Sequence, residues 1–487
     1  MKLTDLLKNI SYKVLAGELD VDIKGIEYDS RKVNDSSIFV AIKGYDTDGH
    51  LYIKEALAKG AKVIVLENEA FVEDYQDVVF IKVDNSRRSL GLISSIFFGE
   101  PSKKLIVVGV TGTNGKTSIT YLLKSILQEA GYKTGIIGTI ENQIGEKVYE
   151  SNVTTPESRD LQELLHEMVM AECQYCLMEA SSHALFLDRV AGIQFKAGIF
   201  TNLTQDHLDF HQDLDEYLEA KKLLFKLVEV DGFSIINIDD PVAKSVIEIA
   251  KGEVTTYGLK NDPDYKATEI NLKLEGTEYL LQTKIDKEKI NLKLIGEFSI
   301  YNSLAAIAAA DKLGIAMETI KAGIKKVKVN GRFEVVNGIS DFAVVVDYAH
   351  TPDGLANVLS TARKITKGRV ICVFGCGGDR DKKKRPIMGR VAGELSDIVI
   401  ITSDNPRTEE PNSIIDMIEA GVKERTKEYL KIENRKAAIE KGISIARKDD
   451  IIVIAGKGHE DYQIIGKIKY HFSDREVAEE YLRSIAK

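Results

Sequence analysis

The chain has 487 residues, of which 44% are hydrophobic and 29% charged, and its formal net charge is -9. This length predicts about three domains of ~150 residues each, and the negative charge argues against a nucleic-acid or anionic-membrane partner, because both reward clustered Lys and Arg. The amino terminus carries charges among its apolar positions, and no apolar segment is long enough to span a bilayer, so we expect a cytoplasmic protein without membrane insertion.

Residues 1–102 are expected to form a first, small α/β domain. Its interpretable segments are residues 25–31 and 37–44, a helical pattern at 51–59 and a strand pattern at 61–66. Strands that alternate with a helix indicate an α/β unit. Asp29, Ser30 and Arg31 fall in a turn where they could bind a ligand. Turn chemistry alone also selects Asp and Ser there, so their spacing favours a structural role.

A phosphate-binding loop is predicted in the second domain, which we place at residues 103–328. An apolar run at 105–108 indicates a buried parallel strand, and helical spacing of apolar residues begins at Ile119. Backbone N–H groups and the helix dipole at such a strand-to-helix turn can hold a polyphosphate. Lys116 would contact the terminal phosphates and the Thr117 hydroxyl would hold Mg²⁺. The loop is a variant, because Val110 replaces the first glycine of the general pattern. Its residues are Gly112, Thr113, Asn114, Gly115, Lys116 and Thr117.

Two further strands of this domain are expected to end in polar residues beside the loop. The strand at 176–178 runs into Glu179, and the strand at 198–202 leads to His207. Residues beyond the carboxyl ends of parallel strands surround the ligand crevice. Thr117, Glu179 and His207 are therefore a plausible protein shell for divalent cations that bridge ATP and a second substrate. Lys221, on an amphipathic helix at 217–225, would ordinarily belong to its solvated face.

The rest of the chain contains two further kinds of secondary-structure pattern. Alternating residues at 270–274, 279–283 and 290–294 indicate antiparallel strands added to the second domain. Strands at 343–347, 369–374, 398–402 and 451–455 alternate with helical segments, which predicts a doubly wound parallel sheet in a third domain at 329–487. Each of these strands ends in a polar or glycine-rich loop, so we expect a site at that edge.

The four cysteines have spacings that a zinc site could use. They are Cys173, Cys176, Cys372 and Cys376. Cys176 and Cys372 lie within apolar strand patterns, however. Buried, inert thiols in a reducing compartment are the better interpretation.

A series of motifs in order gives the chain a family resemblance. They are TGTNGKT, MEASSH, TNLTQDHLDFH, the helix YLEAKKLLF, GEFSIYN, NGRFE and DYAHTPDGL. Together they resemble the Mur ligases, ATP-dependent amide-forming enzymes of cell-wall precursor synthesis, over essentially the whole chain. YDSR, GCGGDRD, DNPRTEEP and AGKGHED further resemble those members that add meso-diaminopimelate to UDP-N-acetylmuramoyl-L-alanyl-D-glutamate.

The resemblance implies three domains that bind UDP, ATP and an amino acid in turn, with ATP and Mg²⁺ as cofactors, small-molecule substrates as partners and a monomeric state. By position it implies catalytic roles for Lys116, Glu179, His207 and Lys221. Lys221 matches the family lysine that is carbamylated, so the implied Mg²⁺ ligands are Thr117, Glu179, His207 and the Lys221 carbamate. Nucleotide contacts are implied for residues 112–117, Asn302, Arg332 and Asp347.

The substrate contacts follow in the same way. Those to the UDP-muramoyl-dipeptide are implied for Ser30, Thr154, Thr155, Ser181 and Arg189, with Leu187 standing where some relatives have Gln. Those to diaminopimelate are implied for Arg380, Asp404, Asn405, Pro406, Arg407, Gly456 and Glu460.

In the implied chemistry, Arg407 determines which amino acid is the incoming substrate. The dipeptide carboxylate would attack the γ-phosphate of ATP to give an acyl phosphate, which an incoming amine then attacks. An Arg fork matches the far carboxylate of diaminopimelate, and Glu460 can accept from its far ammonium. The alternatives are the same ligase with L-lysine, a folylpolyglutamate-type ligase and a nucleotide-switch protein that binds ATP without this chemistry.

Overall fold

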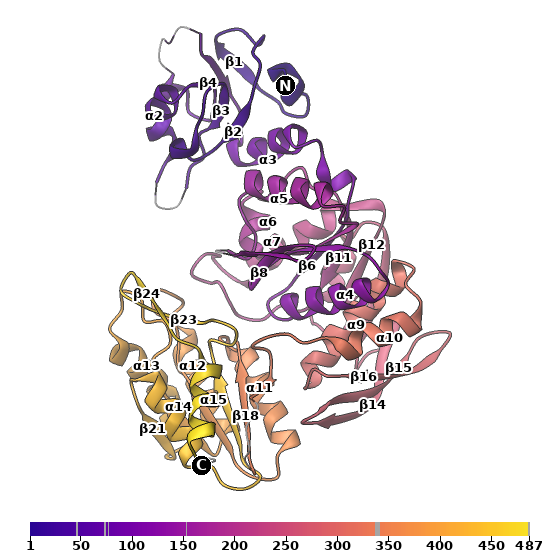
Figure 1. The fold of residues 1–487 in the computed structure, drawn as a ribbon, viewed down its shortest axis with the longest axis vertical. Coiled ribbons are helices and arrows are strands. Elements are labelled where there is room, and N and C mark those ends of the chain that lie inside the picture. The colour runs from indigo at the N-terminus through magenta and orange to yellow at the C-terminus, as the bar shows by residue number, and fades with distance from the viewer. Residues whose placement is uncertain (45–46, 73–74, 76, 152, 337–340, 486–487) are drawn as a thin grey trace.

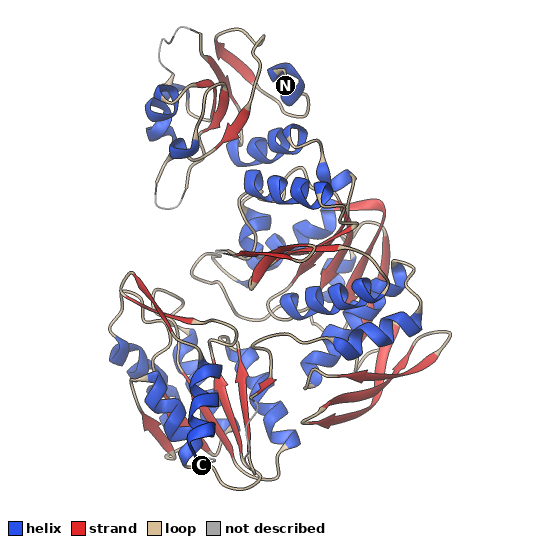
Figure 2. Cartoon of the chain, viewed as in Figure 1, coloured by secondary structure: helices blue, strands red, loops and turns tan. Residues whose placement is uncertain are grey.

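The computed structural model of the chain describes residues 1–44, 47–72, 75, 77–151, 153–336 and 341–485. Its strands form three main sheets, each packed with helices, and the central domain lies between the other two (Figures 1 and 2). This arrangement confirms the predicted three-domain α/β fold. No described helix has the length and apolar run that a membrane crossing requires.

The N-terminal domain is a five-stranded sheet in the order β1-β5-β4-β3-β2, with β1 antiparallel to β5 and the other pairs parallel. Asp29 caps the 3₁₀ helix Ser30–Lys32 by accepting from the Arg31 backbone N–H at 3.0 Å, as turn chemistry predicts. The strands are β1 (Lys13–Ala16), β2 (Gly25–Glu27), β3 (Ser37–Val40), β4 (Ala61–Leu66) and β5 (Val79–Lys82), and the α-helices are α1 (Leu3–Leu6), α2 (Ile53–Ala58) and α3 (Ser86–Phe97).

Helix α3 joins this domain to the central one. It lies beside α5 (Ser158–Met170) of the central domain (Figure 1). Arg87 donates to Glu157 at 2.8 Å, and Tyr28 donates to Asp160 at 2.7 Å. These polar contacts and the helix pair fix the first domain onto the second. The sequence analysis did not identify α3 as a helix.

The central sheet has eleven strands in the order β16-β15-β14-β13-β12-β11-β6-β10-β7-β8-β9. The strands from β14 to β7 in this order run parallel, and the two ends of the sheet are antiparallel. The strands are β6 (Ile106–Thr111), β7 (Thr134–Ile137), β8 (Glu141–Ile144), β9 (Lys147–Glu150), β10 (Tyr175–Glu179), β11 (Phe195–Phe200), β12 (Val228–Asn237), β13 (Glu253–Gly258), β14 (Tyr265–Lys273), β15 (Gly276–Gln282) and β16 (Lys287–Leu292).

The predicted antiparallel strands are confirmed, and they extend the same sheet. Helix α9 (Glu297–Lys312) packs against this part of the molecule, and its run of alanines and leucine is almost fully buried because it is surrounded on several sides. The other central helices are α4 (Lys116–Glu129), α6 (Ser182–Phe186), α7 (Leu214–Leu227), α8 (Ala243–Ile247) and α10 (Met317–Lys326).

The C-terminal sheet has the order β17-β18-β22-β19-β20-β21, parallel throughout except for β17. Its four central strands are the predicted ones, and the sequence analysis missed the two edge strands and the hairpin β23–β24. The strands are β17 (Glu334–Val335), β18 (Ala343–Asp347), β19 (Val370–Phe374), β20 (Ile398–Ile401), β21 (Tyr429–Lys431), β22 (Ile451–Ala455), β23 (Tyr462–Ile465) and β24 (Ile468–His471). The helices are α11 (Pro352–Ile365), α12 (Lys384–Leu395), α13 (Pro411–Lys423), α14 (Arg435–Ser444) and α15 (Asp474–Ile485).

All four cysteines are buried, unpaired thiols, which confirms that prediction. Burial raises the pKa of Cys372 and Cys376 to about 12, so these thiols are unreactive at neutral pH.

Candidate active site

The phosphate-binding loop lies between β6 and α4, as predicted. Gly112 and Gly115 have φ angles of 143° and 92°, which disfavour residues with a Cβ. A Cβ at Gly112 would lie 1.8 Å from the Thr201 hydroxyl oxygen, and one at Gly115 would lie 2.4 Å from the Asn302 amide oxygen. The Lys116 ammonium donates to the carbonyls of Gly112 and Thr113 at 2.8 and 2.9 Å. The loop is thus shaped by close backbone approach, as an anion cradle requires.

Strand order brings the predicted polar residues to this loop. Strand β6 lies between β10 and β11, with Glu179 level with Val110 and Phe200 level with Thr111. The segments that follow the three strands therefore begin at one edge of the sheet, which is where ligands bind in open parallel sheets.

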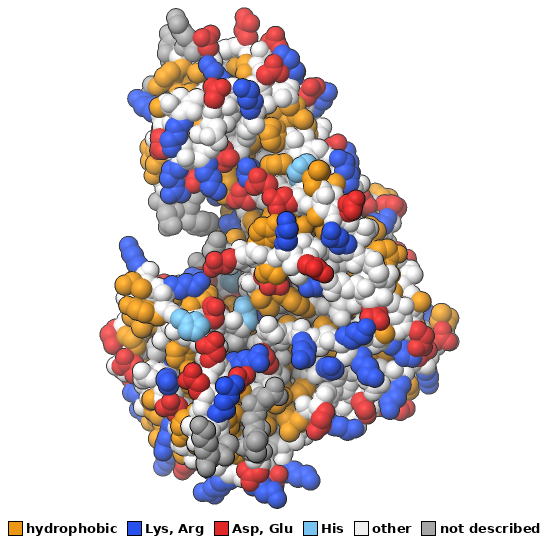
Figure 3. Space-filling model, viewed as in Figure 1, with side chains coloured by type: hydrophobic (Ala, Val, Ile, Leu, Met, Phe, Trp, Pro, Cys, Tyr) orange, Lys and Arg blue, Asp and Glu red, His pale blue; other side chains and the backbone are white. Residues whose placement is uncertain are grey.

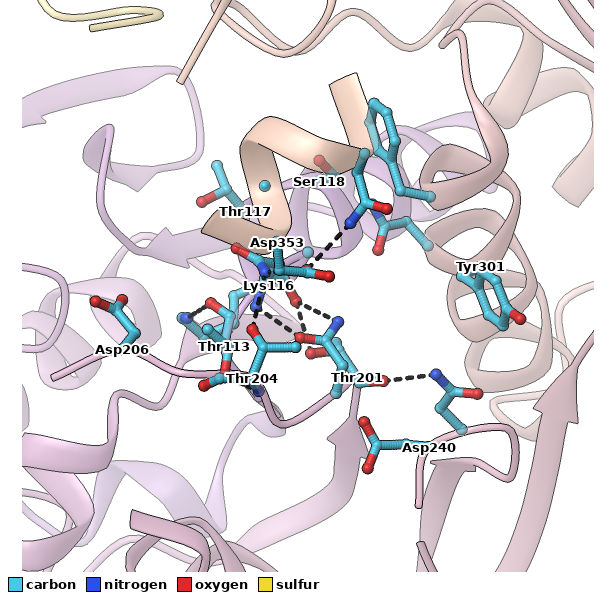
Figure 4. Close-up of a pocket in the computed structure, with 18 of the residues that line it drawn as sticks. Thr113, Lys116, Thr117, Ser118, Thr201, Thr204, Asp206, Asp240, Tyr301 and Asp353 are labelled. Carbon is cyan, nitrogen blue, oxygen red and sulfur yellow. Dashed lines mark hydrogen bonds between the residues drawn. The ribbon is translucent and has the colours of Figure 1, made fainter. Parts of the chain in front are cut away.

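A cavity of about 420 Å³ opens at this edge, between the central and C-terminal domains. In Figure 4, Asp206 and Tyr301 lie on opposite sides of Lys116, with Asp353 beside the lysine. The predicted site residues that line the cavity are Thr113, Asn114, Gly115, Lys116, Thr117, Thr154, Glu179, Ser181, His207, Lys221, Asn302, Arg332 and Asp347.

The four predicted Mg²⁺ ligands share this cavity. Glu179 is 1% exposed and accepts from the Thr139 backbone N–H at 3.0 Å and its hydroxyl at 2.9 Å. His207 has a left-handed φ of 55°, and its Nε2 lies 3.4 Å from Asp206. Within the described ranges, no three His, Cys, Asp or Glu side chains could hold a metal ion by themselves. The protein offers a mixed set with one hydroxyl and one carboxylate, which suits a cation that takes its remaining oxygens from phosphates.

The expectation that Lys221 is solvated is wrong. Its side chain on α7 is 1% exposed, and its ammonium lies 4.0 Å from the centre of the Tyr217 ring. No carboxylate pairs with it among the residues that the structure describes, whereas the adjacent Lys222 pairs with Glu219 at 2.6 Å. Burial, followed by the nearby Lys116 charge, lowers the pKa of Lys221 well below its usual value. The helix turns Lys221 into the cavity because its own apolar face packs against the sheet.

Residues of the C-terminal domain close the nucleotide side. The Arg332 guanidinium donates to the Thr117 hydroxyl at 3.4 Å and stacks on Tyr348 at 4.6 Å. Asp347 accepts from the backbone N–H of Phe333 at 2.6 Å and of Ala349 at 2.7 Å. The Arg332 bond links the C-terminal domain to the phosphate-binding loop, and the Asp347 bond to Phe333 joins the end of β18 to the segment that carries Arg332.

A second polar contact across this boundary was not expected from the sequence. The Asn114 amide donates to Asp353 at 2.8 Å, although the two residues are 239 positions apart. Asp353 lies in the first turn of α11, where an acidic residue has a structural explanation. The sequence placed Asp353 in a polar loop of the third domain, within the motif DYAHTPDGL, but not next to the nucleotide loop of the second domain.

The residues predicted to hold the UDP-muramoyl-dipeptide fall into two groups. Thr155 donates to the Glu179 carbonyl at 2.7 Å, and Arg189 donates to the Thr155 carbonyl at 3.0 Å. The Arg189 Nε is buried without a hydrogen-bond partner among the described residues. Ser30 lies apart in the N-terminal domain, where its hydroxyl donates to Glu55 at 3.0 Å. Figure 3 shows the surface hollowed between the N-terminal and C-terminal domains on this side of the molecule.

The predicted amino-acid contacts gather at the edge of the C-terminal sheet, and none of them lines the nucleotide cavity. The Asn405 amide donates to Glu460 at 2.9 Å, and the Arg407 guanidinium donates to the Gly378 carbonyl at 2.7 Å. A Cβ at Gly456 would lie 2.5 Å from an Asp404 carboxylate oxygen, so only glycine fits there. Pro406 lies within the same loop, because its carbonyl oxygen would lie 1.8 Å from a Cβ at Gly378. Arg380 is exposed and donates to the Asp379 carbonyl at 3.2 Å.

Lys457 is a member of this cluster that the sequence analysis missed. It is fully buried, donates to Asn405 at 2.8 Å, and lies 3.6 Å from both Asp404 and Glu460. Burial opposes ionisation of Asp404, but Lys457 and Arg435 outweigh it, so the pKa of Asp404 is lowered. Burial and the neighbouring Asp404 carboxylate raise the pKa of Glu460. A lone lysine in a glycine-rich loop after a buried strand could have indicated Lys457.

The residues of the short basic run at 379–385 have different environments in the structure. Arg385 is fully buried and makes two hydrogen bonds to Glu409, at 2.9 and 2.7 Å. Lys384 is 7% exposed, and its ammonium lies 3.9 Å from Asp206 across the domain boundary. Lys384 and Arg385 are therefore buried in contacts within the protein, whereas Arg380, Lys382 and Lys383 are exposed.

Known proteins resemble this chain along its whole length. Residues 22–97 match the description "Mur ligase family, catalytic domain", residues 110–310 "Mur ligase middle domain" and residues 331–458 "Mur ligase, glutamate ligase domain". The UDP-N-acetylmuramoyl-L-alanyl-D-glutamate--2,6-diaminopimelate ligase of Clostridium tetani is 50% identical over 490 residues, which cover both chains completely.

Solved structures agree with this likeness. One of a UDP-N-acetylmuramoyl-L-alanyl-D-glutamate--2,6-diaminopimelate ligase has a TM-score of 0.72 and 30% identity, covering 100% of this chain and 99% of that one. A Mycobacterium tuberculosis folylpolyglutamate synthase complexed with ADP and AMPPCP has a TM-score of 0.61 and 17% identity, covering 82% and 94%. That second likeness concerns the fold alone, so the fold does not distinguish the two kinds of ligase.

Proposed function

The chain belongs to the Mur ligase family, and from this premise we propose that it joins meso-diaminopimelate to UDP-N-acetylmuramoyl-L-alanyl-D-glutamate with cleavage of ATP to ADP and phosphate. The product is a peptidoglycan precursor. Full-length identity of 50% to a ligase named for this reaction carries the assignment. Glu460, which Asn405 holds at 2.9 Å, and Arg407 support it, because a carboxylate and a guanidinium match the two charges at the far end of diaminopimelate.

We infer one substrate for each domain. Residues 1–102 would hold the UDP part of the acceptor, residues 103–328 would hold ATP, and residues 329–487 would hold the amino acid. Arg332 and Asp347 come from the third domain yet line the nucleotide cavity. This sharing supports a reaction at the boundary of the second and third domains. A cytoplasmic location and a monomeric state stay predictions.

The chemistry follows from the weakness of a carboxylate as an electrophile. The glutamyl carboxylate of the acceptor would attack the γ-phosphorus of ATP, which breaks the bond to ADP and gives an acyl phosphate. Lys116 and the N-terminus of α4 would neutralise the transferred phosphoryl group, since phosphoryl transfer depends mostly on positioning and charge. The amine of the amino acid would then displace phosphate. Exclusion of water from the buried cavity protects the acyl phosphate.

Thr117, Glu179 and His207 fit the role of Mg²⁺ ligands, because all three face the cavity that the phosphates would enter. Bound Mg²⁺ would supply charge neutralisation for the phosphates. We infer that Lys221 is carbamylated. Its burial without a carboxylate partner supports this, because the carbamate replaces an unpaired buried cation with an anion that faces metal ligands.

One assay tests the function and its alternatives together. ADP release would be measured with UDP-N-acetylmuramoyl-L-alanyl-D-glutamate and, in turn, meso-diaminopimelate, L-lysine, L-glutamate or no amino acid. A parallel reaction would contain a folate and L-glutamate in place of the dipeptide and diaminopimelate. We expect turnover that depends on both the dipeptide and meso-diaminopimelate. Equal efficiency with L-lysine would overturn the amino-acid assignment. Turnover with a folate and L-glutamate, or none with any amino acid, would overturn the whole proposal.

A further inference from the structure

Formation of the amide requires that the incoming amino group lose protons. It is an ammonium in water at neutral pH and ends as an amide N–H, so two protons leave. The first exposes the lone pair. The second leaves after the nitrogen has bonded to the carbonyl carbon, when it is far more acidic than a free ammonium. A weak base at the junction of the two substrates is enough for this second step.

His350 is a candidate for this base. It follows β18 in the segment that closes the nucleotide cavity, and it lines this cavity. Its Nδ1 lies 2.8 Å from the Tyr348 carbonyl oxygen. Because a carbonyl only accepts hydrogen bonds, Nδ1 must carry the proton, and a neutral ring then has its lone pair on Nε2. No hydrogen bond engages Nε2 within the described part of the chain.

The charges around the ring come from both sides of the reaction. Asp206, of the central domain, follows β11 next to His207, and Asp404 belongs to the amino-acid cluster. Both carboxylates interact electrostatically with His350. Charged groups of the central domain and of the amino-acid cluster thus both act on the ring.

The same surroundings keep the ring neutral. Burial, followed by the charge of Lys384, lowers the pKa of His350 to about 4, and Arg332 acts in the same direction. Asp206 opposes this shift, and the His459 ring is a further titratable neighbour. Ligands in the cavity would add phosphate and carboxylate charges, which favour a proton on His350. The ring is thus an acceptor at neutral pH that gains proton affinity when the substrates bind.

We propose that His350 is a catalytic residue whose Nε2 accepts the second proton from the attacking nitrogen as the amide forms. The assignment rests on the proposed ligase function. The C–N bond forms from the nitrogen lone pair. The bond between the carbonyl carbon and the bridging oxygen of the acyl phosphate breaks, and its electrons leave on the phosphate. The proton moves from nitrogen to Nε2. It passes from there to phosphate or solvent, so the ring is regenerated.

The test separates the two half-reactions in the full-length protein. His350→Asn keeps a donor near the position of Nδ1 and removes the base. We expect the kcat for ligation to fall by about 10²-fold or more, while the KM for meso-diaminopimelate is unchanged. Acyl-phosphate formation should also persist. It is measured without amino acid, as movement of oxygen-18 from the β–γ bridge of ATP to non-bridging positions in the presence of dipeptide.

His166→Asn is the matched control. The His166 Nδ1 also bonds to a backbone carbonyl, that of Phe98 at 2.9 Å, but the residue lies on α5 and does not line the cavity. The kcat of His166→Asn should remain near that of the wild type. An unchanged kcat in His350→Asn, or isotope exchange that falls in parallel with kcat, would overturn the assignment.

A second variant covers failure to fold. If His350→Asn lacks a cooperative thermal transition, His350→Ala is assayed with and without added imidazole. Recovery of turnover by imidazole supports the assignment, and absence of recovery overturns it. Failure of the proposed function looks different, because the wild-type protein would then release no ADP with dipeptide and meso-diaminopimelate.

Discussion

Replacing Arg407 by alanine should remove the preference for meso-diaminopimelate over L-lysine. The two amino acids differ by one carboxylate on the far carbon. Each hydrogen bond to a charged group contributes about 1.5–3 kcal/mol. One arm of Arg407 already donates to the Gly378 carbonyl at 2.7 Å in the ligand-free protein, so the carboxylate adds less than two full bonds. We therefore expect a preference of about 2–3 kcal/mol, or roughly 30- to 150-fold in kcat/KM.

The assay compares kcat/KM for both amino acids at saturating ATP and dipeptide. In Arg407→Ala the ratio should approach one, mainly through loss of efficiency with meso-diaminopimelate. The backbone is not expected to change, because arginine and alanine carry the same Cβ at this left-handed position, where φ is 52°. Arg390→Ala is the control, since this arginine lies on α12 and pairs with Glu424 at the end of α13, away from the predicted amino-acid contacts. A ratio in Arg407→Ala that stays at the wild-type value would refute the argument.

Three further outcomes follow from the site and the core. Gly112→Ala places a Cβ 1.8 Å from a hydroxyl oxygen, so ATP binding measured by calorimetry should weaken by about 2 kcal/mol or more, whereas Gly131→Ala, with no atom within 4 Å of its Cβ, should keep its affinity. Lys221→Ala should lower kcat at least ~10- to 100-fold if a carbamate holds metal there, and added formate should restore part of it; full activity without formate would exclude that role. Hydrogen bonding to Arg385 lowers the pKa of Glu409 from an ordinary 4.5 to about 2, although burial acts in the opposite direction. The stabilisation is therefore complete above the unfolded pKa and is lost as the pH falls through about 2, so Glu409→Gln should lower the free energy of unfolding by about 3 kcal/mol at pH 7 and by nearly nothing at pH 2, measured by urea denaturation.

Local patterns in the sequence were enough to predict the nucleotide loop and the strands around it. A buried strand, a glycine turn and a helix are defined by residues within a few positions of one another, and the loop between β6 and α4 lies where the pattern placed it. The rule that parallel strands share a carboxyl edge then brought Glu179 and the segment leading to His207 to the same place. These predictions succeeded because each depends on short-range geometry or on a general rule of sheet topology.

Residues whose environment depends on a distant segment could not be predicted in this way. Lys221 has the spacing of a solvated helix face, and only the packing of α7 shows that it is buried. Lys457 lies in a glycine-rich loop, but its complete burial and its contacts with Asp404 at 3.6 Å and Asn405 at 2.8 Å come from a different loop. Burial and pairing are properties of three-dimensional neighbours, so no local pattern encodes them.

The sequence by itself determined the main strands and the nucleotide loop, the family that the chain resembles and several of the residues at the ligand edges. Only the tertiary structure decided that the third domain meets the nucleotide loop through Asn114 and Asp353, and that His350 of the third domain lines the same cavity as Lys116. The physical reason is that the relative placement of domains depends on a few side-chain contacts between segments hundreds of residues apart. Such contacts leave no periodic signal in the chain.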